Sequence, residues 1–190
     1  MIFPDVVQRG FTLIELLVTL ALVAILANVA APSFIAFQRN AELTSLGNTL
    51  LSAMNAARGE AMKRGRNAFV SPINNEKWES GWVVYVDMDR SQSYSASTDV
   101  TLLSKIGIPA FITISANKNA AASPPYIMFD ASGYSKDKGG GFGAVTFSIF
   151  RNDTSSSQVH NETRRIKIDG PGRVKICKPA SATDINCLPD

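Results

Sequence analysis

A long apolar stretch near the N-terminus constrains the fold of this chain more than any other feature. From Phe11 to Phe37 the sequence contains a single charged residue, Glu15. These 27 residues would form about 40 Å of α-helix, which exceeds the roughly 30 Å hydrocarbon core of a bilayer. After Arg39 the composition is that of an ordinary globular domain. The sequence therefore predicts one membrane-length helix followed by one soluble domain.

Two simpler interpretations of this stretch are a secretory signal peptide and a plain membrane anchor. The stretch is too long for the apolar core of a secretory signal. Its best small-residue cleavage site ends at Ala31 and is followed by Pro32, a poor residue after a cleavage site. These features argue against a signal peptide, whereas a plain anchor remains open.

The position of Glu15 requires an explanation. A carboxylate inside hydrocarbon costs about 2.5–3.5 kcal/mol on insertion scales, so it is expected to have a function there. One interpretation places Glu15 in the interfacial region of the membrane, close to Arg9. The alternative is a partner inside an assembly of packed helices.

The segment "RGFTLIELLVTLALVAILANVAAP" resembles the class III leader of type IV pilins and pseudopilins. In that family a dedicated peptidase cuts after the glycine and methylates the new N-terminal aromatic residue. The resemblance implies cleavage between Gly10 and Phe11, N-methylation of Phe11, and an assembly role for Glu15 and Pro32. Glu15 would then pair with the N-terminal amine of a neighbouring subunit. Cleavage would also remove Arg9, which weakens the interfacial interpretation.

The helical pattern continues beyond the apolar stretch. Pro32 lacks a backbone donor and should bend the helix around Asn28 to Ala31. Apolar residues then recur at spacings of three and four, which predicts one face buried on a globular domain. They are Leu43, Leu46, Leu50, Met54, Ala57 and Ala61. The run "KRGR" predicts the end of the helix near Arg64, with Gly65 as its C-cap.

The rest of the chain has the pattern of short β-strands separated by turns. The strand candidates are "NAFVSP", "GWVVYVDMDR", "DVTLLSK", "AFITISA", "PYIMFDASG", "GAVTFSIF", "TRRIKIDG" and "GRVKIC". Their order resembles the GspH/FimT group of minor pilins and pseudopilins. The resemblance implies an α+β, type IV pilin-like fold, in which a long N-terminal helix packs on an antiparallel sheet. We expect a leader at 1–10, an apolar helix at 11–38, its amphipathic half at 39–66 and a β-rich periplasmic domain at 67–190.

The two cysteines, Cys177 and Cys187, predict a disulfide, because such a domain would lie in the oxidising periplasm. Closing a loop of about ten residues would stabilise the fold by roughly 2.5–3 kcal/mol in the chain-entropy model. The alternative is a metal site, but the only histidine, His160, lies in a polar stretch without further ligands. Within the family, a C-terminal disulfide favours type IV pilus members over the type II secretion pseudopilin.

Catalytic patterns are weak. One histidine, no Cys–His pair at motif spacing and no nucleophile elbow argue against an enzyme. The run "DMDRSQ" at 87–92 begins like a calcium loop but lacks the glycine at its sixth position and the terminal glutamate, so we expect a hairpin turn. The sequence therefore indicates no cofactor and no metal.

Positive charge gathers near the C-terminus. Residues 161–178 carry six basic and two acidic side chains. The basic ones are Arg164, Arg165, Lys167, Arg173, Lys175 and Lys178. Such a face would attract phosphates in a salt-dependent way. The alternative is a solvated strand edge that basic residues protect from pairing with other sheets.

A short pattern in this region also bears on nucleic acid. In the FimT subgroup, a C-terminal G-R-x-R pattern is associated with DNA binding during natural transformation. The matching run here is Gly172, Arg173, Val174 and Lys175, with Lys in the last position. Lysine keeps the charge of arginine but loses its bidentate geometry.

The sequence predicts a minor pilin of a type IV pilus that acts in initiation or at the tip. A second hypothesis, compatible with the first, is that it binds double-stranded DNA for natural transformation. The alternative is a GspH-type pseudopilin of a type II secretion system. Its implied partners are other major and minor pilins, the prepilin peptidase and the inner membrane before assembly. It would be a single-pass inner-membrane protein with a periplasmic domain, and later part of a pilus or pseudopilus.

Overall fold

The computed structural model describes residues 10–154, 159–181 and 184–188, apart from the side chain at position 29. The chain divides into two compact units, Met1–Ala41 and Glu42–Asp190. We call Phe11–Phe37 the apolar segment and Glu42–Asp190 the globular unit. Of the expected leader at 1–10, only Gly10 is described, so the rest of the leader lies outside the described residues.

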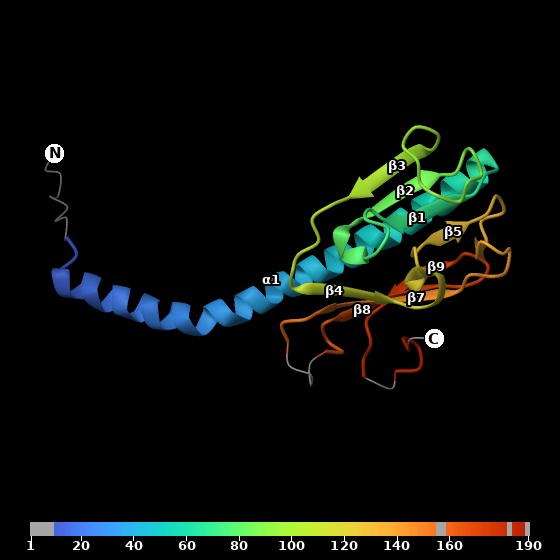
Figure 1. The fold of residues 1–190 in the computed structure, drawn as a ribbon. Coiled ribbons are helices and arrows are strands. Elements are labelled where there is room, and N and C mark those ends of the chain that lie inside the picture. The colour runs from blue at the N-terminus through green and yellow to red at the C-terminus, as the bar shows by residue number, and fades with distance from the viewer. Residues whose placement is uncertain (1–9, 155–158, 182–183, 189–190) are drawn as a thin grey trace, which may run out of the picture. The chain divides into compact units, whose positions relative to one another are not determined.

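Helix α1 extends from Leu13 to Arg64 (Figure 1). It ends as the sequence predicts: Gly65 is left-handed, with φ of 61°, and the Arg66 N–H donates to the Ala61 carbonyl over 3.2 Å. This is the C-cap arrangement that glycine favours, because it has no Cβ to clash in that conformation.

The helix also bends where the proline predicts. The segments Leu13–Asn28 and Ala30–Arg64 differ in direction by 42°. Pro32 explains the position, because it has no N–H to donate to the Asn28 carbonyl four residues earlier. Within the described residues, no single helix is long and apolar enough to cross a bilayer, whereas these two segments taken together meet both criteria.

Two antiparallel sheets form the rest of the globular unit. The first has the order β3-β2-β1-β5-β6, and its strands are β1 Ala68–Pro72, β2 Trp82–Val86, β3 Val100–Lys105, β5 Ile127–Phe129 and β6 Ser135–Lys136. The second has the order β4-β7-β8-β9, and its strands are β4 Ile112–Ala116, β7 Val145–Arg151, β8 Thr163–Ile168 and β9 Val174–Cys177. Two short 3-10 helices, η1 Trp78–Ser80 and η2 Lys118–Ala121, connect strands.

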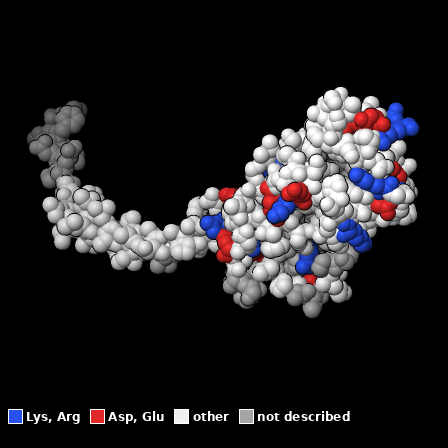
Figure 2. Space-filling model, in the orientation of Figure 1, with Lys and Arg blue, Asp and Glu red and all other residues white. Residues whose placement is uncertain are grey.

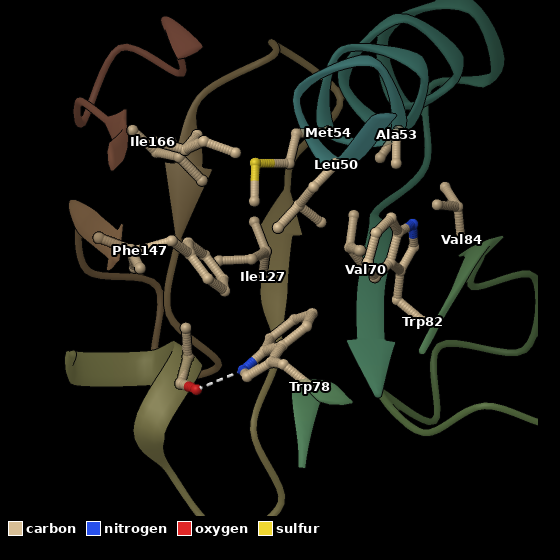
Figure 3. Close-up of a cluster of buried hydrophobic side chains, with 14 of the residues drawn as sticks. Leu50, Ala53, Met54, Val70, Trp78, Trp82, Val84, Ile127, Phe147 and Ile166 are labelled. Atoms are coloured by element: carbon tan, nitrogen blue, oxygen red, sulfur yellow. Dashed lines mark hydrogen bonds between the residues drawn. The ribbon is translucent and has the colours of Figure 1, made fainter. Parts of the chain in front are cut away.

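One hydrophobic core joins the helix to both sheets (Figure 3). Leu50 and Met54 of α1 face Val70 of the first sheet, and Phe147 and Ile166 of the second. The complete predicted stripe is buried: Leu43, Leu46, Leu50, Met54, Ala57 and Ala61. Burial of a large apolar side chain contributes about 1.5–3 kcal/mol, so this stripe fixes the position of the helix between the sheets.

Trp78 ties the two sheets together beneath the helix. Its Nε1–H donates to the Ala120 carbonyl over 2.8 Å, the bond drawn in Figure 3. Its ring meets Phe147 edge-on, with centroids 4.9 Å apart. Next to it, the Glu79 carboxylate accepts the Ile114 N–H over 2.9 Å.

The expected α+β, pilin-like fold is confirmed, and each of the eight strand candidates contains a strand. Two features differ from the expectation. The strands form two sheets, and the two-residue strand β6 and both 3-10 helices were not predicted. The short elements escape sequence patterns because two to four residues are too few to show a period.

Candidate functional site

The apolar segment presents large apolar side chains to its surroundings. Ile14, Ile25 and Phe37 are 64 %, 62 % and 72 % exposed. In Figure 2 the visible face of this segment has no coloured side chain, whereas charged groups of both signs are scattered over the globular unit. Exposing so many apolar side chains to water is unfavourable, so the apolar segment requires lipid or other helices as its surroundings.

Glu15 lies in the first turn of α1 and has a partner within its own chain. Its Oε2 accepts bonds from the Thr12 backbone N–H and the Thr12 hydroxyl, both over 2.9 Å. In return, the Thr12 Oγ1 accepts the Glu15 N–H over 3.3 Å. This reciprocal arrangement is a capping box, in which a threonine and a glutamate three residues later satisfy the first donors of a helix.

The capping box gives Glu15 a partner within its own chain, in addition to the two positions considered from the sequence. The T-x-x-E spacing directly before an apolar run would have indicated it from the sequence. The box holds the carboxylate on the backbone N–H of Thr12, the residue that follows Phe11 in the sequence.

The structure does not bring the six basic residues of the C-terminal strands onto one face. Arg164 and Arg165 are consecutive in β8, so their side chains point to opposite sides of the sheet. Arg164 faces α1: its Nη2 donates to the Thr44 hydroxyl over 3.0 Å, and its Cβ and Cγ lie close to Gly47. Burial lowers the pKa of its guanidinium, against the opposing effect of the Glu162 carboxylate.

Arg165 lies on the outer face and holds the C-terminal loop. Its Nη1–H donates to the carbonyl of Cys187, which forms a disulfide with Cys177, the residue opposite Arg165 in β9. The predicted disulfide is thus confirmed, with ten residues of separation between its two cysteines. Within the loop, backbone N–H groups of Ala180 and Asn186 donate to Asp184 and lower the pKa of its carboxyl.

Of the remaining basic residues, Lys175 is exposed and Lys167 is half-buried. Lys167 and Lys175 face each other directly across β8 and β9, on the same side as Arg165. Arg173 pairs with Asp169 over 2.7 Å and is 70 % exposed, and Lys178 is exposed. Lys167 and Lys175 therefore place two positive charges side by side on this face, an arrangement that costs the sheet some stability.

Gly172, at the start of the G-R-x-K run, has a structural role. It is left-handed, with φ of 79°, and a Cβ there would lie 1.8 Å from the Gly133 carbonyl oxygen. Arg58 of α1 bridges the same place: its Nε–H donates to the Gly133 carbonyl over 2.9 Å and its Nη2–H to the Pro171 carbonyl over 3.3 Å. Only glycine allows the two turns to approach this closely on the helix.

Three carboxylates in the loop between β2 and β3 lie close enough together to hold a cation. Oxygens of Asp87, Asp89 and Asp99 are within 4.8 Å of one another. They already accept backbone bonds: Ser91 and Gln92 donate to Asp87, and Ser95 donates to Asp99. Burial raises the pKa of Asp87, whereas bonds from Ser91 lower that of Asp89 to about 2. The cluster orders its own loop, in agreement with the turn expected at 87–92.

The globular unit also has a concave site that the sequence did not predict. Loops from four parts of the globular unit surround a cavity of about 450 Å³ on the outer face of the first sheet. We call it the tyrosine cavity, after Tyr85, Tyr94 and Tyr126 in its lining. No sequence pattern could have found it, because its residues are brought together only by folding.

Comparisons with known proteins agree with this geometry. The profile of the family described as Type II transport protein GspH matches residues 46–182, and that of the prokaryotic N-terminal methylation motif matches residues 7–27. No curated protein sequence matches the chain.

The solved structures that this chain resembles include proteins of two bacteria. Type IV minor pilin FimU of Pseudomonas aeruginosa is similar in two crystal forms. In one the identity is 21 % and the TM-score 0.55, covering 76 % of this chain and 99 % of that chain. In the other crystal form the identity is 20 % and the TM-score 0.53, and the match covers 70 % of this chain and 91 % of that chain. The minor pseudopilin EpsH of the Vibrio cholerae type 2 secretion system is 14 % identical, with a TM-score of 0.46 and coverage of 74 % and 99 %.

The contact at Gly172 gives a stability prediction with a matched control. Gly172→Ala should lower the free energy of unfolding by about 2 kcal/mol or more, because the new Cβ overlaps a backbone carbonyl in addition to straining φ. Gly107→Ala is the control: φ is 78°, but nothing lies within 4 Å of the added Cβ. Urea unfolding followed by the fluorescence of the buried Trp78 and Trp82 measures both. Equal losses in the two variants would contradict the role of Gly172.

Proposed function

Because the chain belongs to the family described as Type II transport protein GspH, we propose that it is a minor subunit of a type IV pilus that assembles through its N-terminal helix. The observation that carries this proposal is the exposed apolar segment, which carries the Thr12–Glu15 box near its start and whose residues 11–27 fall in the match to the N-terminal methylation motif. A role of this kind needs no catalytic residue, cofactor or metal.

The proposed assembly starts with processing. Cleavage between Gly10 and Phe11 removes the leader at 1–10 and leaves Phe11 with an N-methylated amine. The residues at 11–38 then anchor the protein in the inner membrane as a single span, with the domain at 67–190 in the periplasm. The prepilin peptidase is the first partner, and other major and minor pilins are the next.

Within the filament, the Glu15 carboxylate pairs with the amine of a neighbouring subunit. Such a pair neutralises two charges that would each be costly in hydrocarbon. The capping box supports this role, since it fixes the rotamer of Glu15 before any neighbour arrives. Pro32 provides the bend that adapts the helix to its neighbours.

A test of this role separates the charge of Glu15 from its capping function. Glu15→Gln retains a capping box but removes the charge, whereas Thr12→Ala removes the capping hydroxyl and retains the charge. We expect Glu15→Gln and Glu15→Ala to insert into the membrane normally and to enter filaments about tenfold less than wild type. Thr12→Ala should assemble close to the wild-type level.

The measurement is an immunoblot of sheared filaments against the membrane fraction, in a host with the prepilin peptidase. Mass spectrometry of each variant should show N-methylated Phe11, which controls for processing. Wild-type incorporation of Glu15→Gln would refute the charge pairing, and a defect in Thr12→Ala alone would show that helix capping matters instead.

A second candidate function is that of a GspH-type pseudopilin in type II secretion, which the family description favours. The two machines differ in what a deletion abolishes. Loss of pili or twitching with protein export intact is expected for a pilus subunit that acts in initiation or at the tip. A block in export with normal piliation would assign the protein to the secretion machine.

We also propose that the globular unit binds double-stranded DNA, as in natural transformation, through a smaller set of residues than the sequence indicates. Lys167 and Lys175 form the centre, because they face each other on the outer side of β8 and β9. Arg173 and Lys178 lie nearby in the chain and are exposed. Arg164 and Arg165 are engaged with Thr44 and Cys187, so they contribute less to this surface.

Removing the two central lysines tests this proposal. Lys167→Ala with Lys175→Ala should weaken DNA binding in a mobility-shift assay and reduce the slope of log K against log salt by about 2, one for each lost phosphate contact. The control is Lys77→Ala with Lys118→Ala, two exposed lysines elsewhere in the globular unit. The assay uses the full chain in detergent at 50 to 200 mM salt, a range in which phosphate contacts change affinity strongly. Unchanged binding and slope in the first pair would exclude this surface.

A further inference from the structure

The tyrosine cavity lies on the face of the first sheet that points away from α1. Its floor belongs to a small second cluster of buried residues separate from the main core. Phe69 of β1 stacks on Tyr85 of β2, with ring centroids 5.3 Å apart and planes 10° apart. Tyr126, just before β5, approaches Phe69 at 6.2 Å. The outer face of this sheet thus carries a cluster of three aromatic rings, which are buried under the loops around the cavity.

The loop between β2 and β3 forms one wall. Tyr94 leans over Tyr85, with centroids 5.0 Å apart at 49°, and its hydroxyl bonds to the Thr101 hydroxyl over 2.8 Å. Asp99 holds the start of the next turn through the Ser95 N–H over 2.8 Å. Tyr94 therefore stands with an exposed aromatic face at the mouth of the cavity, fixed at both its ring and its hydroxyl.

Polar side chains without partners in the described structure surround this aromatic floor. They are Asn75, Glu76 and Gln92, whose side-chain amides and carboxylate make no hydrogen bond with the described residues. Asn75 and Gln92 are also left-handed, with φ of 59° and 58°. Gln92 is held there by its N–H bond to Asp87 over 3.1 Å. A non-glycine residue with left-handed φ carries backbone strain, and strained residues of this kind cluster at binding sites.

Charge in the lining is balanced. Glu76 contributes one negative charge, and Lys138 contributes one positive charge, with its Nζ 4.9 Å from the Tyr126 ring centroid. An ionic ligand gains little from such a site. A purely apolar ligand would leave the amides and the carboxylate unpaired, which costs about 1–3 kcal/mol for each buried group.

From these contacts we infer that the tyrosine cavity binds a neutral saccharide. A sugar ring has an apolar C–H face that packs on an aromatic ring, and hydroxyls at its edge that donate to carboxylates and exchange bonds with amides. Tyr94 offers the ring and Glu76, Asn75 and Gln92 offer the edge partners. The volume of about 450 Å³ lies within the range of small-molecule sites and suits one or two sugar units. This inference does not depend on the filament role.

Saturation-transfer difference NMR on the full chain tests the inference. The detergent must not contain sugar, so dodecylphosphocholine micelles replace maltosides. The probes are maltose and N,N′-diacetylchitobiose, which differ in their N-acetyl groups, at up to about 10 mM because a millimolar Kd is expected for a short sugar. We expect saturation transfer to the ring C–H protons of at least one probe. No transfer to either probe would overturn the inference.

Matched variants locate the binding. Tyr94→Ala should weaken it about tenfold or more, because the exposed ring is lost. Tyr134→Ala is the control, since Tyr134 is 41 % exposed against 39 % for Tyr94 and does not line the cavity. Glu76→Ala removes an exposed carboxylate with no structural bond, so it should leave the fold intact and weaken binding about threefold or more. Wild-type affinity in both cavity variants, or an equal loss in Tyr134→Ala, would contradict the assignment.

Discussion

The buried stripe of α1 is the contact on which the rest of the globular unit depends. The two sheets have separate strand orders and share no backbone ladder among the described strands. Packing on the helix gives them one core, and single bonds, such as that from the Ser135 N–H of β6 to the Gly170 carbonyl after β8, add to it. The stripe includes Ala57 and Ala61, both fully buried, and small residues let the strands approach the helix closely. Trp78 and Arg58 add directional bonds to this packing, to η2 and to two turns. The large apolar side chains of the apolar segment are exposed instead, so their surroundings decide what the segment does.

Much of the fold could be predicted because its patterns are local. The 3.6-residue stripe gave the buried face of α1, Pro32 gave the bend, and Gly65 gave the helix end. The eight strands have apolar runs bounded by turn residues. The division into two sheets could not be predicted, because strands such as β4 and β5 have similar patterns and only packing on the helix decides which sheet each one joins.

The candidate sites show the same boundary between local and non-local information. Spacing alone predicts the capping box of Thr12 and Glu15. It also predicts that Arg164 and Arg165 point to opposite sides of the sheet, which divides the basic residues that composition had grouped together. The tyrosine cavity and the contact of Gly172 with Gly133 are different. They join residues from distant parts of the chain, so no single window of sequence contains them. Gly172 also shows that a residue within a binding pattern can be required by the turn that carries the pattern.

The packing of α1 against both sheets has a mechanical consequence. Tension transmitted along the chain enters the globular unit through the helix, which contacts both sheets along its buried stripe. The load is therefore divided between the sheets in parallel, and rupture requires sliding the whole stripe past both surfaces at once. At the far end of the chain, the Cys177–Cys187 bond ties the C-terminal tail to the end of β9. A subunit built in this way resists pulling through a shear geometry, which yields at higher force than the unzipping of one strand at a time.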